Sequence, residues 1–224
     1  MKSSSKIVFI VIICFALTVA TGCATKQVRH SGFLENYPEF KTGPQGGADF
    51  VYMKEGVDFS VYNKIMMNHV VLFFEDHTDY KGIHPEELAE MSNAFHKAIT
   101  DNLQGAYPLV AEPGPDVMRL RFAITDVVAS KPGMGTVATV MPISLALSTV
   151  KKGATGKHTG VGQASIEVEI LDSVTNERIG AAIDTRPGRK MEGFSKWGAV
   201  EGAFEFWAKR LRTWLDEIHG KEGD

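Results

Sequence analysis

The chain has 224 residues, 44% of them hydrophobic, with 24 basic and 27 acidic side chains and a formal charge of −3 at pH 7. This length can bury a core without disulfide bonds, and the mildly acidic balance argues against a nucleic-acid partner, which requires a basic surface. Both cysteines, Cys14 and Cys23, lie near the N-terminus, so the rest of the sequence offers no disulfide, thiol nucleophile or cysteine metal site.

The N-terminus has the three-part layout of a secretory signal peptide. Lys2 and Lys6 provide a basic head, residues 7–20 are mainly apolar, and small residues lead to Gly22 and Cys23. The four residues that end at Cys23 resemble a bacterial lipobox, which implies cleavage between Gly22 and Cys23 and a lipid on the Cys23 sulfur. The alternatives are an ordinary signal peptide cut nearby or an uncleaved anchor, although a membrane span needs about 20 apolar residues.

A lipid on Cys23 would attach the chain to a membrane, which is therefore its first expected partner. Residue 24 is alanine, whereas enteric lipoproteins that stay in the inner membrane carry aspartate there. For a bacterium with two membranes we expect the outer membrane and its periplasmic face. We divide the chain into a signal peptide (1–22), a lipid-anchored tether with an N-terminal arm (23–49) and a single domain (50–224).

The first elements follow from apolar patterns. Apolar residues within 31–37 predict that the N-terminal arm packs against the domain, and a short strand is expected at 49–53. A second strand is predicted at 65–74. Its last five residues are apolar on both faces, which is typical of a central strand covered by helices.

Two helices are predicted. The first begins at Pro85, which suits the first helical turn, and ends near Gly105, because glycine often terminates helices. The second covers 195–219 with Ser195 as its N-cap. Its apolar residues follow alternating steps of three and four, which favours a helix lying on a sheet, and a coiled-coil seam is the alternative.

Further strands are expected at 107–111 and 117–128, and a hairpin should join 163–172 to 178–185. In the first hairpin strand, isoleucine and valine alternate with Glu167 and Glu169. This alternation predicts one buried face and one face open to water. The order of elements predicts an α+β domain, in which two helices pack on one face of a mostly antiparallel sheet.

No charged residue occurs between residues 133 and 150. Serines, threonines and Pro142 make this segment too polar and too broken for a membrane span, and connections of this length are often functional. Three interpretations stay open, namely a flap over the core, a surface that docks onto a partner such as an envelope protein complex, and a loop that contacts the membrane. The apolar side chains that could make such a contact are Met134, Val137, Val140, Ile143, Leu145 and Leu147.

The sequence lacks the G-x-S-x-G, H-E-x-x-H and phosphate-loop motifs. We therefore expect no enzymatic activity, no catalytic residue and no cofactor. The best metal candidate is the acidic stretch 75–79, whose oxygen and nitrogen atoms suit a divalent cation, but a solvated turn is the commoner explanation and we expect no metal. His69 and His96 have no local partner that would tune them, so we expect structural roles.

Three short stretches also carry a likeness to a known family. They are Ser31-Gly32-Phe33-Leu34 with Tyr37, then Val57-Asp58-Phe59-Ser60 with Tyr62, and then Gly162-Gln163-Ala164 leading to Glu167-Val168-Glu169-Ile170-Leu171-Asp172. In these stretches the chain resembles a family of uncharacterised bacterial lipoproteins, a domain-of-unknown-function group found mostly in proteobacteria. The resemblance covers nearly the whole chain after Cys23 and implies no established activity.

The lipobox, the missing catalytic motifs and the segment 133–150 together favour a lipid-anchored, non-enzymatic periplasmic protein of the outer membrane. It would act as an accessory or scaffold in envelope assembly or transport. The alternative is a small-ligand or lipid-binding module, because apolar strands under a helix that carries tryptophans can leave a pocket. A hydrolase of envelope polymers is a third hypothesis, which would need placed acid and base groups. The oligomeric state stays open.

Overall fold

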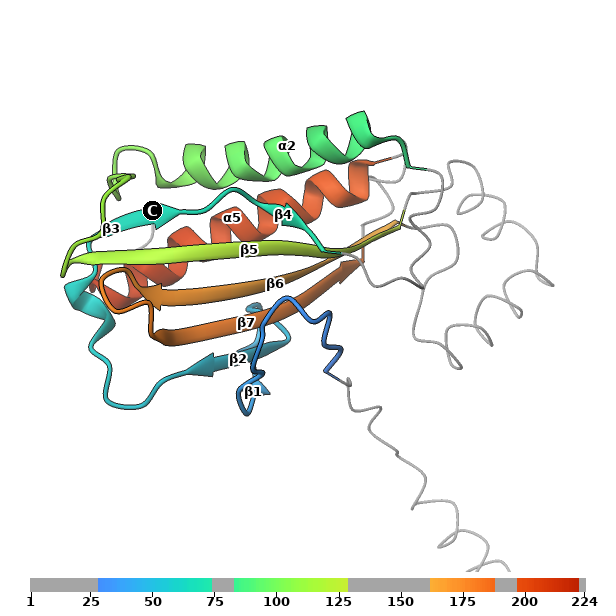
Figure 1. Cartoon of the computed structure of the whole chain (residues 1–224). Helices are drawn as coiled ribbons and strands as arrows, with labels where there is room; N and C mark the ends of the chain where they lie inside the picture. Colours follow the sequence, from blue (N-terminus) through green and yellow to red (C-terminus); the bar gives the residue numbers. More distant parts are fainter. Residues whose placement is uncertain (1–27, 74–82, 129–161, 188–196, 222–224) are drawn as a thin grey trace, which may run out of the picture.

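The computed structural model describes residues 28–73, 83–128, 162–187 and 197–221. In chain order its elements are β1 (Lys41–Thr42), β2 (Phe50–Met53), the short 3-10 helix η2 (Phe59–Val61), β3 (Lys64–Met67), β4 (Val71–Leu72), α2 (Pro85–Leu103), β5 (Val117–Val128), β6 (Gln163–Asp172), β7 (Arg178–Pro187) and α5 (Gly198–Ile218). The two helices form one layer, and the strands form a second layer beneath them (Figure 1).

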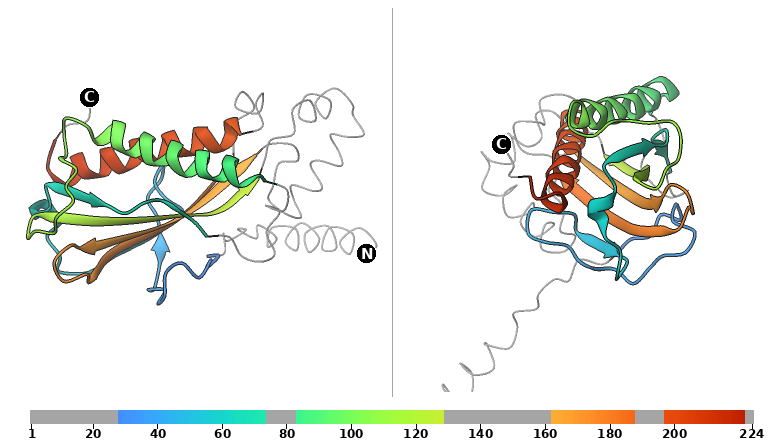
Figure 2. Two further views of the ribbon diagram at one scale, coloured as in Figure 1. Left: turned by 45° about the horizontal axis from the view of Figure 1, so that its top comes forward. Right: turned by 90° about the vertical axis from the view of Figure 1, so that its left-hand side faces the viewer.

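The described strands form a seven-stranded sheet with the order β1-β2-β7-β6-β5-β3, and β4 also pairs with β5. Neighbouring strands from β1 to β5 are antiparallel, whereas β3 and β4 run parallel to β5. Both helices cover the same face of the sheet, which Figure 2 shows from two further sides. The expected α+β fold, with two helices on one face of a mostly antiparallel sheet, is confirmed.

The strand predicted at 117–128 and the hairpin predicted at 163–172 and 178–185 are present as β5, β6 and β7. The three strands lie side by side in the sheet. The hairpin turn contains Asn176, whose φ of 57° lies in the left-handed region that asparagine tolerates. Asp172 accepts hydrogen bonds from two backbone N–H groups of the turn, at 3.1 and 2.7 Å. The turn residues therefore fix the pairing of the hairpin.

The prediction of one central strand at 65–74 is wrong. β3 and β4 replace it, separated by residues 68–70, and they lie at the edge of the sheet beside β5. The apolar residues of this edge contact two different layers. Ile65 is buried in the core under the helices, whereas Phe73 contacts the ring of Phe33 on the N-terminal arm at a centroid distance of 6.1 Å. An edge can thus be apolar on both faces when separate elements cover each face.

The strand expected at 107–111 is reduced to a single bridge, in which Leu109 pairs with Ile65. The neighbouring Tyr107 is only 2% exposed, and its hydroxyl donates a hydrogen bond to Asp216 of α5 at 2.8 Å. A tyrosine that is buried with its hydroxyl bonded satisfies its polar end. This segment therefore ties α5 to the connection between α2 and β5 instead of adding a strand.

Helix α2 begins and ends where the sequence predicts. Pro85 occupies its first turn, and the side chain of Glu87 accepts a hydrogen bond from the backbone N–H of His84 at 3.3 Å. The acidic first turn complements the positive end of the helix dipole. The helix ends at Leu103, and Gly105 follows with a φ of 78°, a conformation that is readily available only to glycine.

Helix α5 begins at Gly198 with Trp197 as its N-cap, so the predicted N-cap at Ser195 is wrong, and Ser195 itself lies outside the described residues. The indole N–H of Trp197 donates to Glu87 of α2 at 3.2 Å, which joins the beginnings of the two helices. The predicted apolar stripe packs against the core, as expected for a helix on a sheet. Its members are Trp197, Val200, Phe204, Trp207, Leu211, Trp214 and Ile218.

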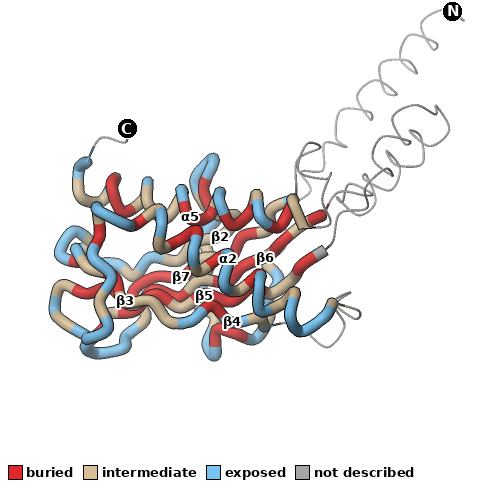
Figure 3. The backbone as a smooth tube through the Cα atoms, turned by 90° about the horizontal axis from the view of Figure 1, so that it is seen from above, coloured by how far each residue is buried: buried red, intermediate tan, exposed pale blue. Residues whose placement is uncertain are grey.

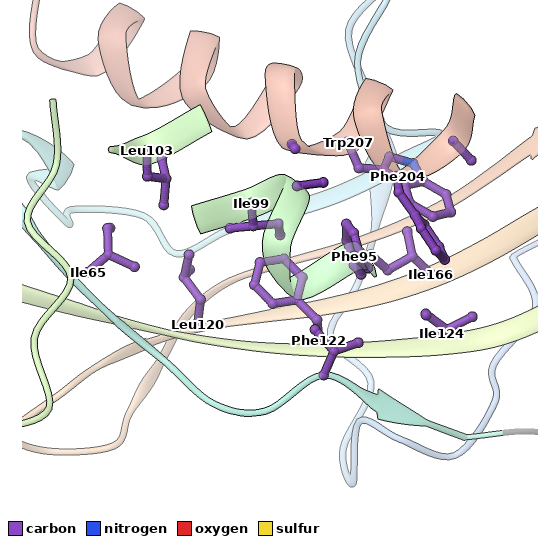
Figure 4. Close-up of a cluster of buried hydrophobic side chains, with 14 of the residues drawn as sticks. Ile65, Phe95, Ile99, Leu103, Leu120, Phe122, Ile124, Ile166, Phe204 and Trp207 are labelled. Carbon is purple, nitrogen blue, oxygen red and sulfur yellow. The ribbon is translucent and has the colours of Figure 1, made fainter. Parts of the chain in front are cut away.

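The hydrophobic core lies between the helices and the sheet, where Figure 3 shows the buried parts of the strands beneath the helices. Phe95 of α2 is 0% exposed. Its ring centroid lies 5.6 Å from that of Phe122, 4.9 Å from that of Phe204 and 5.7 Å from that of Trp207, as Figure 4 illustrates. These contacts join α2, β5 and α5 in one aromatic cluster.

The opposite face of the sheet is partly covered by residues 28–40 of the N-terminal arm (Figure 1). Phe33 and Leu34 of the arm are buried against Ala123 of β5 and Ala181 of β7. The apolar residues within 31–37, from which the sequence predicts packing, are the ones that make this contact. The sheet is therefore sandwiched between two helices and an irregular arm.

The arm explains why one expectation about β6 is wrong. The alternation in this strand predicts that Glu167 and Glu169 face water, yet their exposed fractions are 1% and 4%. Glu167 is covered by the arm, and Glu169 is covered by the guanidinium groups of Arg121 and Arg178. Charged side chains tolerate such burial when they are paired and hydrogen-bonded.

Candidate functional site

A pocket of about 270 Å³ opens between α5 and the sheet, on the part of the sheet that contains β2, β7 and β6. Helix α2 packs over the other half of the sheet, near β4 and β5, so α5 covers this part alone. Most of the lining is apolar. The main lining residues are Val51, Met53, Phe122, Ile166, Val168, Ile170, Ala182, Phe206, Trp207, Leu211 and Trp214.

Small residues on β7 create the space. The strand presents Gly180, Ala182 and Asp184 toward α5, because these three alternate along the strand and pair with Ile170, Val168 and Ile166 of β6. Ala182 lines the pocket, and its methyl group is too short to fill the gap beneath the tryptophans of the helix. The space above Gly180 is instead occupied by the side chains of Ile170 and Met53. The pocket is therefore a consequence of side-chain size on one strand, which no motif records.

Asp184 forms the polar wall of this pocket and is 1% exposed. Its carboxylate accepts hydrogen bonds from the indole N–H of Trp207 at 2.6 Å, from Nε of Arg186 at 2.6 Å and from the backbone N–H of Asp49 at 2.9 Å. Burial raises the pKa of Asp184, which the Trp207 bond and the Arg186 charge oppose. The carboxylate is thus fully engaged in holding β7, α5 and the approach to β2 together.

This arrangement suits binding better than chemistry. Small-ligand sites are usually concave and mostly apolar, with a few placed polar groups, and have volumes of about 300–1,000 Å³. The pocket lies just under that range. A second charged residue in its lining is Arg210, which pairs with Glu217 at 2.9 and 3.2 Å. Among the described residues that line the pocket there is no serine, cysteine or histidine that would act as a nucleophile or base.

On the other face of the sheet, Glu167 is the anchor of the N-terminal arm. Its carboxylate accepts hydrogen bonds from the backbone N–H of Ser31 at 2.7 Å and from the hydroxyl of Tyr37 at 2.8 Å. The same hydroxyl accepts a bond from the backbone N–H of Gly32 at 2.7 Å, and the ring of His30 stacks on Tyr37. Burial, and next the bond to Glu167, raise the pKa of Tyr37, so the hydroxyl stays protonated and donates.

Two of the stretches that carry the family resemblance therefore meet in space, since Ser31 and Tyr37 contact Glu167. A second such contact links the stretch that ends at Tyr62 with Asp172. The Tyr62 hydroxyl donates a hydrogen bond to the Asp172 carboxylate at 2.9 Å. Burial, and next the bond to Asp172, raise the pKa of Tyr62 to about 12. The stretches that carry the resemblance thus make contacts that attach the N-terminal third of the chain to the hairpin.

Removing the Tyr37 hydroxyl should loosen the arm. The substitution Tyr37→Phe deletes the bonds to Glu167 and Gly32, so we expect a loss of about 1–2 kcal/mol in the free energy of unfolding and faster amide exchange at Ser31 and Gly32. Urea unfolding and hydrogen exchange measure both quantities. Tyr52→Phe is the matched control, since its hydroxyl makes no hydrogen bond with a described residue. Unchanged exchange in Tyr37→Phe would show that these bonds do not hold the arm.

The residues that the sequence singles out for lipid attachment and contact lie outside the described ranges. These are Gly22 and Cys23, the stretch 75–79, and the six apolar residues of 133–150, which are Met134, Val137, Val140, Ile143, Leu145 and Leu147. The expectations about them stay predictions. Within the ranges that the structure describes, no group of three or more histidine, cysteine or acidic side chains is placed to hold a metal ion.

His69 and His96, for which the sequence predicts structural roles, lie close together. The ring centroids of His69, between β3 and β4, and His96, on α2, are 5.5 Å apart. Nδ1 of His96 is buried without a hydrogen-bond partner in the described structure. Burial, and next the charge of His69, lower the pKa of His96, so the neutral ring is favoured. Neither histidine is among the described residues that line the pocket under α5, and their structural role stays a prediction.

Neither of the described helices, α2 and α5, is long and apolar enough to cross a membrane.

Comparison of the structure with solved proteins gives weak likeness. The chain is similar to the PelC dodecamer from Paraburkholderia phytofirmans (TM-score 0.40, 11% identity, 71% of this chain and 96% of that one). It is also similar to a DUF330 protein from Xanthomonas campestris (TM-score 0.40, 9% identity, 75% and 92%).

Sequence comparison is more informative. The chain is 26% identical over 190 residues to the uncharacterised lipoprotein YdcL of Escherichia coli strain K12, and the match covers 83% of this chain and 84% of YdcL. The protein of the same name in E. coli O157:H7 matches equally well. The family model for DUF3313, described as a protein of unknown function, matches residues 29–211. That span includes all the strands, the arm from Arg29 and most of the pocket lining, and it ends before Trp214. The chain therefore belongs to the DUF3313 family, a group of uncharacterised bacterial lipoproteins.

Proposed function

We propose that the chain is a lipid-anchored, non-enzymatic binding protein of the envelope, which holds an apolar ligand such as a fatty acyl chain between α5 and β7. The apolar pocket carries this proposal. Its floor consists of aliphatic strand residues and its roof of Phe206, Leu211 and Trp214. Arg210 also lines the pocket, and its guanidinium would favour an anionic ligand head. Turnover of a substrate in a hydrolase screen, lost on a point mutation, would contradict the non-enzymatic role.

Filling the pocket should abolish ligand binding while the fold persists. Val168 of β6 lines the pocket, so Val168→Phe adds a ring where an acyl chain would lie. We expect at least tenfold weaker binding of a dansyl-labelled undecanoic acid, measured by fluorescence titration of the purified full chain. Val174→Phe is the matched control, because Val174 is 58% exposed on the hairpin turn.

Native mass spectrometry of the purified protein provides an independent readout of the same proposal. A co-purified fatty acid or lipid that is present in the wild type and in Val174→Phe, but absent from Val168→Phe, would support it. Thermal unfolding checks that both variants are folded. A folded wild type that binds no labelled fatty acid and carries no apolar ligand would overturn the proposal.

The proposed location is the periplasmic face of the outer membrane, through a lipid on Cys23. Membership of a lipoprotein family supports the anchor, and alanine at residue 24 supports the outer membrane in a two-membrane bacterium. Mass spectrometry of the full chain should find acylated Cys23 at the N-terminus, and fractionation should find the protein with outer-membrane markers. An unacylated N-terminus would contradict the lipid anchor. Recovery with inner-membrane markers would contradict the outer-membrane location.

A second candidate function is that of an accessory or scaffold in envelope assembly or transport. The uncharged segment 133–150 supports it, because large apolar surfaces often mark contact sites. In-cell crosslinking should compare the wild type with a deletion of residues 135–152. A specific envelope complex that is lost in a still-folded deletion variant would establish the scaffold role. If the wild type and the deletion variant captured the same complex, the segment would not be the docking surface.

A further inference from the structure

A second cleft, of about 420 Å³, lies on the sheet face opposite α2 and α5 and is separate from the apolar pocket. It occupies the end of the sheet near the β6–β7 turn, beside the part of the N-terminal arm that contains Glu35 and Asn36. Its lining is largely polar, in contrast to the pocket under α5. The residues around it are Glu35, Asn36, Arg119, Arg121, Glu169 and Arg178.

The charges in this cleft are unbalanced. Three guanidinium groups line it, against the carboxylates of Glu35 and Glu169. Glu169 is nearly buried and is shared, since Arg121 donates to one of its oxygens and Arg178 donates to the other at 2.7 Å. One carboxylate therefore neutralises only one of the two arginines that it positions.

Arg119 completes the surplus of positive charge. Its Nε donates to the amide oxygen of Asn68 at 2.8 Å, and its Nη1 donates to the amide oxygen of Asn176 at 2.6 Å. Both partners are neutral, and Arg119 forms no ion pair with a described carboxylate. A guanidinium carries more N–H donors than the two that are used here, so this group keeps both its charge and donor capacity for a ligand.

The surrounding contacts hold these arginines in place before any ligand arrives. Asn68 and Asn176 clamp Arg119 from opposite sides of β5, Arg178 also donates to the backbone carbonyl of Asn36, and the guanidinium of Arg121 lies 5.1 Å from the centroid of the Phe33 ring. Arginine forks fixed by packing match the oxygen spacing of phosphate and carboxylate groups. Preorganised donors also lose little freedom when they bind.

We propose that this cleft binds the oxyanion group, phosphate or carboxylate, of a small anionic ligand, with Arg119 as its main contact and Arg121 and Arg178 beside it. The same chemistry fits a free metabolite and the head group of a lipid in the adjacent membrane leaflet. The site is independent of the apolar pocket, since it lies on the other face of the sheet and shares no lining residue with it.

Calorimetric titration of the full chain in a non-ionic detergent tests this proposal with three ligands, namely inorganic phosphate, glycerol 3-phosphate and glucuronate. We expect at least one to bind and Arg119→Gln to weaken it by about 10- to 100-fold, the usual effect of losing charge-assisted hydrogen bonds. Arg119→Lys should restore only part of the affinity, because lysine keeps the charge but not the fork. Lys97→Gln, which removes an exposed positive charge from α2, should bind like the wild type.

The ligands separate the possible sources. Tighter binding of glycerol 3-phosphate than of inorganic phosphate supports a lipid head group, equal binding supports a free phosphate, and preference for glucuronate supports an acidic sugar. Thermal unfolding confirms that each variant is folded. The proposal is overturned if the folded wild type binds none of the three, or if Arg119→Gln binds as tightly as Lys97→Gln.

Discussion

Replacing Phe95 by alanine should lower the free energy of unfolding by about 3–5 kcal/mol, the usual cost of deleting a buried aromatic ring. Phe95 is fully buried and contacts Phe122, Phe204 and Trp207. Because these rings belong to two different elements, β5 and α5, the cavity cannot close by moving one element alone. Domains are commonly stable by only about 5–15 kcal/mol, so we expect a large fall in the urea midpoint.

Glu90→Ala on the same helix is the control for Phe95→Ala, since Glu90 is exposed. Surface substitutions of this kind change stability by about 0.5 kcal/mol or less. A parallel loss of helical circular dichroism and of tryptophan fluorescence in Phe95→Ala would show that both layers unfold together. If Phe95→Ala were as stable as Glu90→Ala, the aromatic cluster would not be the centre of the core.

Asp184→Ala should be the second most damaging substitution, with an expected cost of about 2–4 kcal/mol at pH 7. It leaves the buried indole N–H of Trp207 and the backbone N–H of Asp49 without this acceptor, and it removes the partner of Arg186. Unsatisfied buried donors cost about 1–3 kcal/mol each, and loss of one member of a buried ion pair adds to that cost.

The cost of Asp184→Ala should also depend on pH. Burial raises the pKa of Asp184 above its ordinary value of 3.8, so the folded protein holds this proton more tightly than the unfolded chain does. The contribution of Asp184 to stability is therefore complete below pH 3.8 and falls as the pH rises through the raised pKa. Urea unfolding at pH 4 and pH 7 should find the larger cost at pH 4.

Asp101→Ala serves as the control for that pH dependence. Asp101 is an exposed aspartate of α2 that pairs with Lys97, and its side chain is 53% exposed. Exposed ion pairs of this kind contribute about 0–1 kcal/mol, so we expect a small effect at both pH values. A cost of Asp184→Ala that is equal at both pH values, or larger at pH 7, would contradict the raised pKa.

The sequence predicts the elements whose patterns are local. Pro85 and Gly105 frame α2, and the alternation along 117–128 identifies β5, because each signal lies within its own segment. Prediction fails where a distant segment decides the outcome. The local pattern predicts that Glu167 faces solvent, but the arm, more than 120 residues earlier in the chain, covers this side chain in the folded protein. The edge position of β3 likewise depends on pairing with β5, which a run of apolar residues cannot specify.

The sequence predicts the apolar pocket only as an alternative and without its lining residues, and it does not predict the arginine cleft. The apolar pocket depends on Ala182 being small where α5 crosses β7, and a small residue in a strand carries no functional signature. The arginine cleft assembles Arg119, Arg121 and Arg178 from two strands that are brought together by β6 between them. Their spacing along the chain gives no hint of this meeting, since only the register of the sheet places them around Glu169.

In a chain anchored through a lipid on Cys23, the attachment of the arm would also set how far the body can stand from the membrane. Ser31, which is bound to Glu167, follows Cys23 by eight residues, and eight fully extended residues reach at most about 29 Å. With the arm released as far as Lys41 at the start of β1, which follows Cys23 by eighteen residues, the reach would be at most about 65 Å. The bonds to Glu167 and the burial of Phe33 and Leu34 would together hold a body anchored at Cys23 close to the bilayer. Release of the whole arm would roughly double the distance that the body can reach.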